Sequence, residues 1–253
     1  MRALQTSALL SCLALCSCLE MEQKVTIKPD GSGTQALKMT LRDSLITELR
    51  RRQPAAQLGP GSDPTAVFDE DKVRGELSTV GMSLSSHRVV RERGLRTVDM
   101  VASFASFGDL QQSPLCGSAV EWELGAGPKP GLAKLTLYPQ GKAAWQQARA
   151  RVKTMQREAD PVAAQYFRKR QAQLRGLDME LRFELPGDVL VWTKNMKKVA
   201  AREVVARVEA EQIKTPADLI RRLAPRFEVI FDARGTTLLT DPKVGNTPAA
   251  PGR

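Results

Sequence analysis

Histidine and cysteine are scarce in this chain of 253 residues, which holds one histidine and four cysteines. Most protein metal sites are assembled from several such side chains, so the sequence predicts no metal centre and no cofactor. The composition is otherwise ordinary for a globular protein, with 42% hydrophobic and 26% charged residues. This balance excludes a wholly disordered chain and a fibrous repeat.

Long hydrophobic runs are also missing. The most apolar segment, residues 7–19 (SALLSCLALCSCL), has about 13 residues, whereas a transmembrane helix needs about 20. Arg2 precedes this segment and gives it the positive start that is typical of a secretory signal peptide. We therefore interpret residues 1–17 as a signal peptide and expect the protein to be exported.

The end of this segment, residues 15–18 (LCSC), resembles the lipobox of bacterial lipoproteins, in which a leucine stands three positions before an invariant cysteine. The resemblance implies that Cys18 becomes the first residue of the mature protein and carries acyl chains such as palmitate. Two alternatives stay open: Cys12 follows a similar but very early Leu-Leu-Ser sequence, and the cysteines can be apolar filler of the signal core.

The lipobox interpretation places the protein outside the cytoplasm, anchored in a membrane of the cell envelope. Leu19 stands where some bacteria with two membranes use aspartate to retain lipoproteins at the inner membrane, so in such a host we expect the outer membrane. If Cys18 carries lipid, Cys116 has no intramolecular partner, and no disulfide framework is expected.

Basic residues outnumber acidic ones by 38 to 28, and the formal net charge of +10 favours anionic partners. Export and the small number of aromatic residues argue against a nucleic-acid partner. The densest basic group lies in a helical region expected at about 141–177, and one interpretation is attraction to anionic lipid headgroups; the other is an ordinary solvated helix face. The group comprises Arg149, Arg151, Lys153, Arg157, Arg168, Lys169, Arg170 and Arg175.

The same helical region has an apolar stripe, because Trp145, Val152 and Met155 recur at helical spacing. We expect the basic residues to lie opposite this stripe. Asp160 and Pro161 are typical of a helix start, so a second helix is expected after them.

Strand-like and helix-like patterns elsewhere in the chain predict the α+β class. Alternating apolar and polar residues flank turns rich in glycine and proline, which is typical of β-hairpins. We expect one domain over residues 18–240, built as an antiparallel β-sheet of hairpins packed on one side by helices, with a helical insertion at about 141–177 and a disordered tail at 241–253. The expected strands lie within 25–41, 82–107, 119–138, 178–192, 203–211 and 227–231, and the expected helices within 44–49, 73–77, 141–177 and 216–223.

Two short stretches add a further resemblance. Residues 25–33 (VTIKPDGSG), and far downstream residues 181–189 (LRFELPGDV) followed by Asn195, resemble the LppM-type domain of bacterial lipoproteins. The resemblance would cover residues 19–235. It implies an extracytoplasmic, lipid-tethered α+β domain that handles lipids or envelope components and is not a catalyst.

The candidates for catalysis are isolated residues and acidic pairs. His87 has no nucleophile-elbow motif to accompany it and is expected to be a surface-strand histidine, while Cys116 is expected to be a buried or idle thiol. The acidic pairs have ready structural roles at a helix start and on a wet strand face. These pairs are Asp69 with Asp71, and Glu121 with Glu123.

The sequence therefore predicts that the protein is not an enzyme. We expect a binding or envelope-assembly role at a membrane surface, with an anionic lipid or an envelope protein as partner. The alternative is a secreted or envelope hydrolase with an unrecognised active site. A closed apolar pocket would favour binding, whereas His87 or Cys116 in a polar cleft beside carboxylates would favour the hydrolase.

Overall fold

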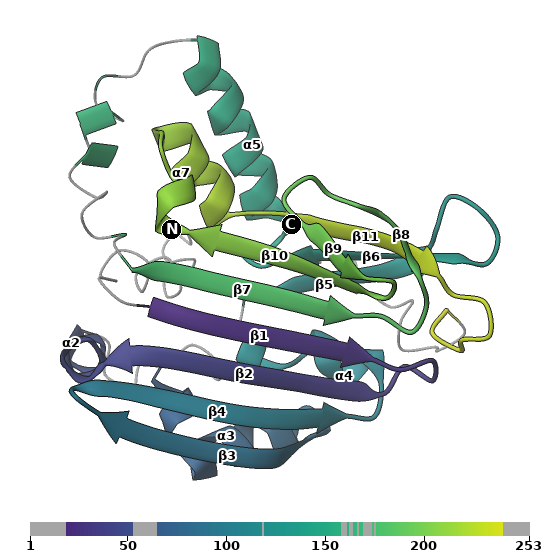
Figure 1. The fold of residues 1–253 in the computed structure, drawn as a ribbon, viewed down its shortest axis with the longest axis horizontal. Coiled ribbons are helices and arrows are strands. Elements are labelled where there is room, and N and C mark those ends of the chain that lie inside the picture. The colour runs from purple at the N-terminus through teal and green to yellow at the C-terminus, as the bar shows by residue number, and fades with distance from the viewer. Residues whose placement is uncertain are drawn as a thin grey trace, which may run out of the picture.

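The computed structural model describes residues 19–52, 65–117, 119–157, 161, 164–165, 167–168, 174 and 176–239. Two mostly antiparallel β-sheets and several helices make up this part of the chain, which confirms the predicted α+β class (Figure 1). The expected signal peptide, Cys18 and the tail at 241–253 lie outside the described residues.

The larger sheet has seven strands in the order β3-β4-β2-β1-β7-β10-β9. Every neighbouring pair is antiparallel except β1 and β7, which are parallel over the eight residue pairs from Leu19↔Leu177 to Thr26↔Glu184. The parallel pair departs from the all-antiparallel prediction. The strands are β1 (Leu19–Ile27), β2 (Gly33–Arg42), β3 (Met82–Glu92), β4 (Leu95–Phe104), β7 (Leu177–Glu184), β9 (Lys197–Ala200) and β10 (Glu203–Glu209).

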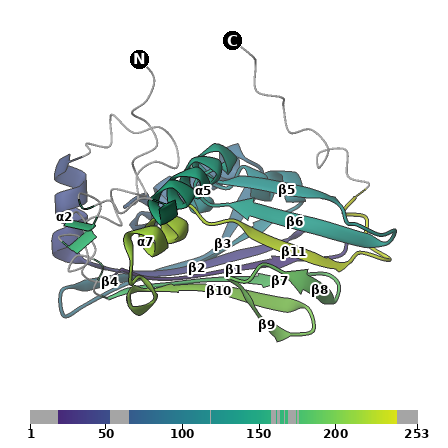
Figure 2. The ribbon, with the colours of Figure 1, turned by 90° about the horizontal axis from the view of Figure 1, so that it is seen from above.

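A second sheet of four strands, in the order β5-β6-β11-β8, lies against one side of the larger sheet (Figure 2). Sequence alternation predicts these segments as strands of a single sheet. The structure shows that the prediction of one sheet is wrong, because these four strands form a second sheet. The strands are β5 (Glu121–Ala126), β6 (Leu132–Tyr138), β8 (Val189–Trp192) and β11 (Phe227–Asp232).

The helices gather on the side of the larger sheet that also carries the smaller sheet, as expected for a sheet covered on one side (Figures 1 and 2). Helix α7 starts as the Thr215-Pro216 sequence predicts: Thr215 Oγ1 accepts the Asp218 backbone N–H, and the Asp218 side chain accepts the Thr215 N–H. The described helices are α2 (Asp43–Arg52), α3 (Glu70–Thr79), α4 (Phe107–Gln111), α5 (Lys142–Arg157) and α7 (Pro216–Leu223), with 3₁₀ turns η2 (Ala66–Phe68), η3 (Pro114–Cys116) and η5 (Ala210–Gln212).

The hydrophobic core lies between the two sheets. Its centre is Trp122 of β5, whose ring meets Phe183 of β7 and Phe107 of α4 edge to face, with ring centroids 5.9 and 6.2 Å apart. Aromatic pairs in this geometry stabilise a fold by about 0.5–1.5 kcal/mol beyond the burial of their area. The contact therefore holds both sheets and α4 together.

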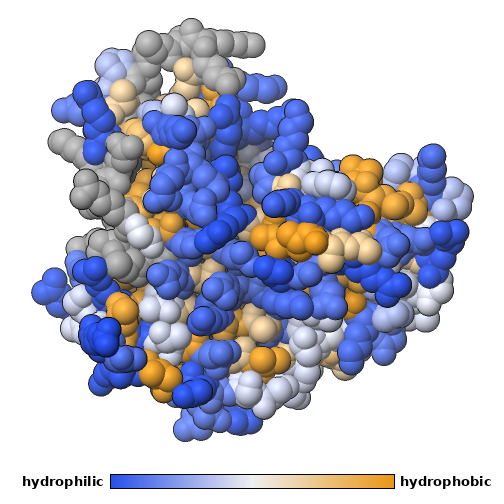
Figure 3. All heavy atoms as spheres, viewed as in Figure 1, coloured by the Kyte–Doolittle hydropathy of each residue, from blue (hydrophilic) through white to orange (hydrophobic). Residues whose placement is uncertain are grey.

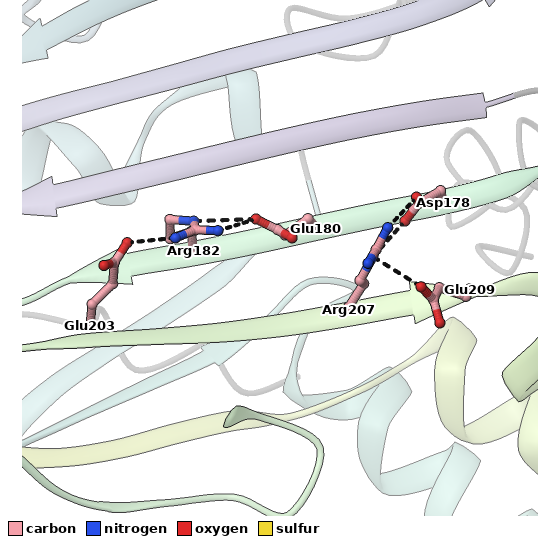
Figure 4. A network of polar contacts seen from close by, with 6 residues as sticks. All are labelled: Asp178, Glu180, Arg182, Glu203, Arg207 and Glu209. Atoms are coloured by element: carbon pink, nitrogen blue, oxygen red, sulfur yellow. Dashed lines mark hydrogen bonds and ion pairs between the residues drawn. The ribbon is translucent and has the colours of Figure 1, made fainter. Parts of the chain in front are cut away.

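The outer face of the larger sheet is polar and its charges pair with one another. Arg182 of β7 contacts Glu180 and Glu203, and Arg207 of β10 contacts Asp178 and Glu209 (Figure 4). Hydrogen bonds to Glu180 and then to Glu203 raise the pKa of Arg182, so its charge is secure. Residues 178–185 alternate between apolar and charged side chains, so Phe183 and Leu185 are buried while the charged residues between them pair on the outer face.

Candidate functional site

The two sheets are tightly packed at one end and separated at the other. Val25, Phe183 and Val204, which are paired across β1, β7 and β10, are at most 1% exposed. Met21 and Met179, which are paired four residues closer to the start of β1 and β7, are only partly buried. The inner face of the larger sheet thus loses its close cover toward this end.

An apolar cavity of about 110 Å³ occupies the space where the sheets separate. Its walls come from β1, β7 and β10 on one side, from β5, β6 and β11 on the other, and from α7. Apolar cavities of comparable size stay dry and accept small apolar molecules. The apolar lining comprises Met21, Val120, Trp122, Leu137, Pro139, Leu174, Leu177, Met179, Leu181, Ala206, Val208, Ile213, Leu219, Leu223, Pro225 and Phe227.

One polar atom of this lining has no partner. The indole N–H of Trp122 is buried, and it makes no hydrogen bond to any residue in the described part of the chain. Leaving a buried donor unsatisfied costs about 1–3 kcal/mol. The edge-to-face contacts with Phe107 and Phe183 hold the ring in place.

A basic groove lies directly beside the apolar cavity. It encloses about 670 Å³ between α5, α7, the loop at 193–195 and the segment 224–227. Cavity and groove share Val208, Arg222, Pro225 and Phe227 as lining residues. Among the described residues that line it, Asp218 is acidic, and the basic ones are Arg149, Lys153, Lys194, Arg221, Arg222 and Arg226.

Trp145 of α5 provides an aromatic surface in this groove. The guanidinium groups of Arg149 and Arg226 lie 5.6 and 5.0 Å from the centre of its ring, within the range of cation–π attraction. Tyr138 packs against the same ring at 5.7 Å, and burial raises the pKa of its hydroxyl, which keeps it neutral. The ring thus holds two positive charges close to one aromatic surface.

The groove cations are only partly neutralised. Asp218 pairs with Arg221 at 3.4 Å, and Arg226 lies 3.7 Å from Glu228. Lys153 and Lys194 form no ion pair with any residue that the structure describes. These free ammonium groups, together with the two arginines over the indole, suit a bound anion.

The predicted basic residues of the helical region are distributed unevenly. Arg149 and Lys153 line the groove beside Trp145 and Val152, at the border of the apolar stripe and not opposite it. Arg151 and Arg168 are exposed and do not line the groove. The Arg157 side chain, and Lys169, Arg170 and Arg175, lie outside the described residues. Lys194, Arg221 and Arg226 were missed because they lie far away in the sequence.

His87 is not the surface-strand histidine that the sequence predicts. Its side chain is 4% exposed, because η2 and α3 cover this part of β3. Nε2 lies 2.9 Å from the carbonyl oxygen of Val67, and Nδ1 lies 4.0 Å from a carboxylate oxygen of Glu70. The histidine lines neither the cavity nor the groove. Its contacts with Val67 and Glu70 join β3 to η2 and α3, so its role is structural.

The acidic pairs have structural contacts. Asp69 caps α3 by accepting the Lys72 backbone N–H. Glu121 accepts the backbone N–H of Lys142 at the start of α5, and Glu123 binds the Lys142 ammonium group, whose pKa this hydrogen bond raises. The side chain of Cys116, the last residue of η3, lies outside the described part.

The described ranges contain no cluster of metal-binding side chains and no membrane-spanning helix. No group of three or more histidine, cysteine or acidic side chains there could hold a metal ion. None of the described helices combines the length and the hydropathy that crossing a membrane requires.

Comparisons with known proteins find matches among solved structures only. No family model matches the chain, and no curated protein matches it. Four chains of solved structures match, among them the folded domain of the LppM protein of Mycobacterium tuberculosis, determined by NMR. That domain is 12% identical, the match covers 86% of this chain and 91% of the domain, and the TM-score is 0.42. The likeness is a weak one of overall fold and assigns the chain to no family.

Proposed function

We propose that this protein is a lipid-anchored, extracytoplasmic binding protein without catalytic activity, and that its ligand is an anionic amphiphile. The apolar part of the ligand enters the cavity between the sheets, and its negative head lies in the basic groove. One observation carries the proposal: Arg222 and Phe227 line both spaces, so the cavity and the groove are neighbours and one molecule of suitable length would span them.

The cavity supports the apolar half of this proposal. Met21 and Met179 stand at its wider end, and methionine side chains adapt to the shape of what they contact. Most of the remaining lining is aliphatic or aromatic, from Trp122 and Leu137 to Phe227. The cavity is therefore suited to the apolar chain of a ligand.

The groove supports the anionic half. Each basic residue close to an anionic lipid surface contributes about 1 kcal/mol to binding. Lys153, Lys194 and the guanidinium groups over Trp145 converge on one space beside the cavity opening. A phosphate or carboxylate head fits this charge, and a neutral head does not.

Blocking the cavity is expected to weaken binding of an apolar chain. Ala206, which is 2% exposed, lines the cavity, and Ala206→Phe fills it. Titration with the fluorescent fatty acid 11-(dansylamino)undecanoic acid is expected to show affinity reduced tenfold or more, which is about 1.4 kcal/mol. Val205→Phe is the matched control, because Val205 is paired with Arg182 on the wet face of the same strand.

The same titration separates the head from the chain. The double variant Lys153→Glu with Lys194→Glu is expected to weaken binding of the fatty acid but not of its methyl ester, since only the acid is charged. Equal losses in Ala206→Phe and Val205→Phe, or no binding by the wild type, would contradict the proposal.

The lipid anchor is tested separately. The lipobox-like residues 15–18 support lipidation of Cys18, which would place the anchor immediately before β1. Expressed in a bacterial host, wild-type protein is expected to partition into detergent and to carry the mass of attached acyl chains. Cys18→Ala is expected to lose both properties. A wild-type protein that carries no acyl mass would exclude the anchor without touching the cavity.

A further inference from the structure

The three most exposed large hydrophobic residues in the described part of the chain lie on β8 and β9, and Trp192 of β8 is exposed beside them. Leu190 and Val191 are 51% and 54% exposed, Val199 is 46% exposed and Trp192 is 38% exposed. They fall in the region of Figure 3 where hydrophobic residues reach the surface among hydrophilic ones, over β8 and β9. We call β8, β9 and the loop between them, residues 189–200, the edge segment; β8 pairs with β11 and β9 pairs with β10.

The edge segment joins the open edges of both sheets. β8 is the last strand of the four-stranded sheet, and β9 is the last strand of the seven-stranded sheet. Open edges pair readily with strands of other chains unless something prevents it. Here the register shifts at Ile230/Phe231 and at Glu203/Val204, which breaks the regular pairing of β8 and β9 with their neighbours. Such irregularities and edge lysines disfavour addition of another strand.

Positive charge surrounds these apolar side chains. Lys194 and Lys197 are exposed and form no ion pair with a described residue. Lys198 donates to the Val189 carbonyl oxygen, and Arg202 pairs with Asp188 at 3.3 Å. Residues 188–202 therefore hold four basic groups against one acidic group. Lys194 also lines the basic groove, so the patch and the groove adjoin.

We propose that the edge segment is a membrane-docking surface whose occupant is an anionic bilayer. A protein partner that adds a strand is disfavoured by the irregular edges, whereas a bilayer asks for no backbone pairing. Tryptophan and aliphatic side chains favour the membrane interface, and lysines around them favour anionic headgroups. The proposal does not depend on what the cavity binds.

Trp192 is a natural reporter of docking. The full chain is reconstituted into vesicles of phosphatidylglycerol with brominated acyl chains, and the fluorescence that Trp192→Phe removes is assigned to Trp192. This emission is expected to be quenched about twofold or more in phosphatidylglycerol and much less in phosphatidylcholine. High salt is expected to reduce the quenching, because it screens the lysines.

Paired variants locate the contact. Leu190→Ser with Val191→Ser is expected to reduce the quenching of Trp192 to the level seen in phosphatidylcholine. Val89→Ser with Val90→Ser is the matched control, since these β3 residues are 39% and 40% exposed on the opposite edge of the larger sheet. Lys197→Glu, which leaves Lys194 of the groove unchanged, is expected to weaken the preference for phosphatidylglycerol.

Three results would overturn the proposal. They are a Trp192 emission that bromolipids do not quench, a loss of quenching in the Val89/Val90 variant equal to that in the Leu190/Val191 variant, and a dimer that buries Trp192 in the absence of lipid. The last is read by cross-linking and by sedimentation. Thermal unfolding of each variant confirms that these exposed substitutions leave the fold intact.

Discussion

Gly187→Ala is expected to lower the free energy of unfolding by about 4 kcal/mol or more. A loss of this size would leave most molecules of the variant unfolded. A Cβ atom at this position would lie 1.7 Å from the carbonyl oxygen of Asp232 and 2.8 Å from its carbonyl carbon. Both are backbone atoms at the end of β11, and the Asp232 N–H is also bonded to the Asp188 carbonyl. The clash therefore cannot be relieved by rotation of a side chain.

The position matters because the chain leaves the larger sheet there. Gly187 lies in the turn between β7 and β8, so forcing it away from β11 separates the two sheets. Denaturant unfolding followed by circular dichroism measures the loss. Gly75→Ala in α3 is the control, because a Cβ atom added there would have no neighbouring atom within 4 Å. This substitution is expected to raise the free energy of unfolding by about 0.5–1 kcal/mol. A loss below about 1 kcal/mol in Gly187→Ala would show that β11 is not held against this turn.

Phe183→Ala is expected to cost about 3–5 kcal/mol of unfolding free energy. The side chain is 1% exposed, and its ring meets Trp122 edge to face across the two sheets. Its truncation leaves a void beside the existing cavity, and the packed backbones of β1 and β10 on either side cannot collapse into it.

Chemical unfolding again measures this change, with Trp122 fluorescence as a second probe of the contact. Val205→Ala, on the wet face of β10, is expected to change the free energy by less than about 1 kcal/mol. Comparable costs for the two substitutions would mean that the core does not lie between the sheets.

The sequence predicts which faces of the strands are buried better than it predicts their partners. Residues 178–185 alternate as expected, with Phe183 inward and Glu180 and Arg182 outward. Alternation carries no information about neighbours, so neither the parallel pairing of β1 with β7 nor the second sheet was predictable. Pro186 and Gly187 indicate the end of a strand. The sequence does not indicate that the chain passes from the larger sheet to the smaller one at this point.

The candidate site was predictable only in part, for a related reason. Arg149 and Lys153 were identified because they lie on one helix with a clear period. Lys194 and Arg226 join them only through tertiary structure. Trp122 was recognised as a strand residue, but its lack of a hydrogen-bond partner depends on every neighbour of the ring. His87 was misjudged because the residue pattern of β3 does not show that η2 and α3, which precede it in the chain, fold back over its side chain.

The central place of β1 has a consequence for the order of assembly. On one side β1 pairs with β2, which follows it directly in the chain. On the other side it pairs with β7, which begins about 150 residues later at Leu177. Long-range pairings of this kind form slowly, because a long loop must close first. While the chain emerges during synthesis, one edge of β1 therefore stays bare until residue 177 and beyond are available, and a nascent chain needs protection from aggregation during that interval.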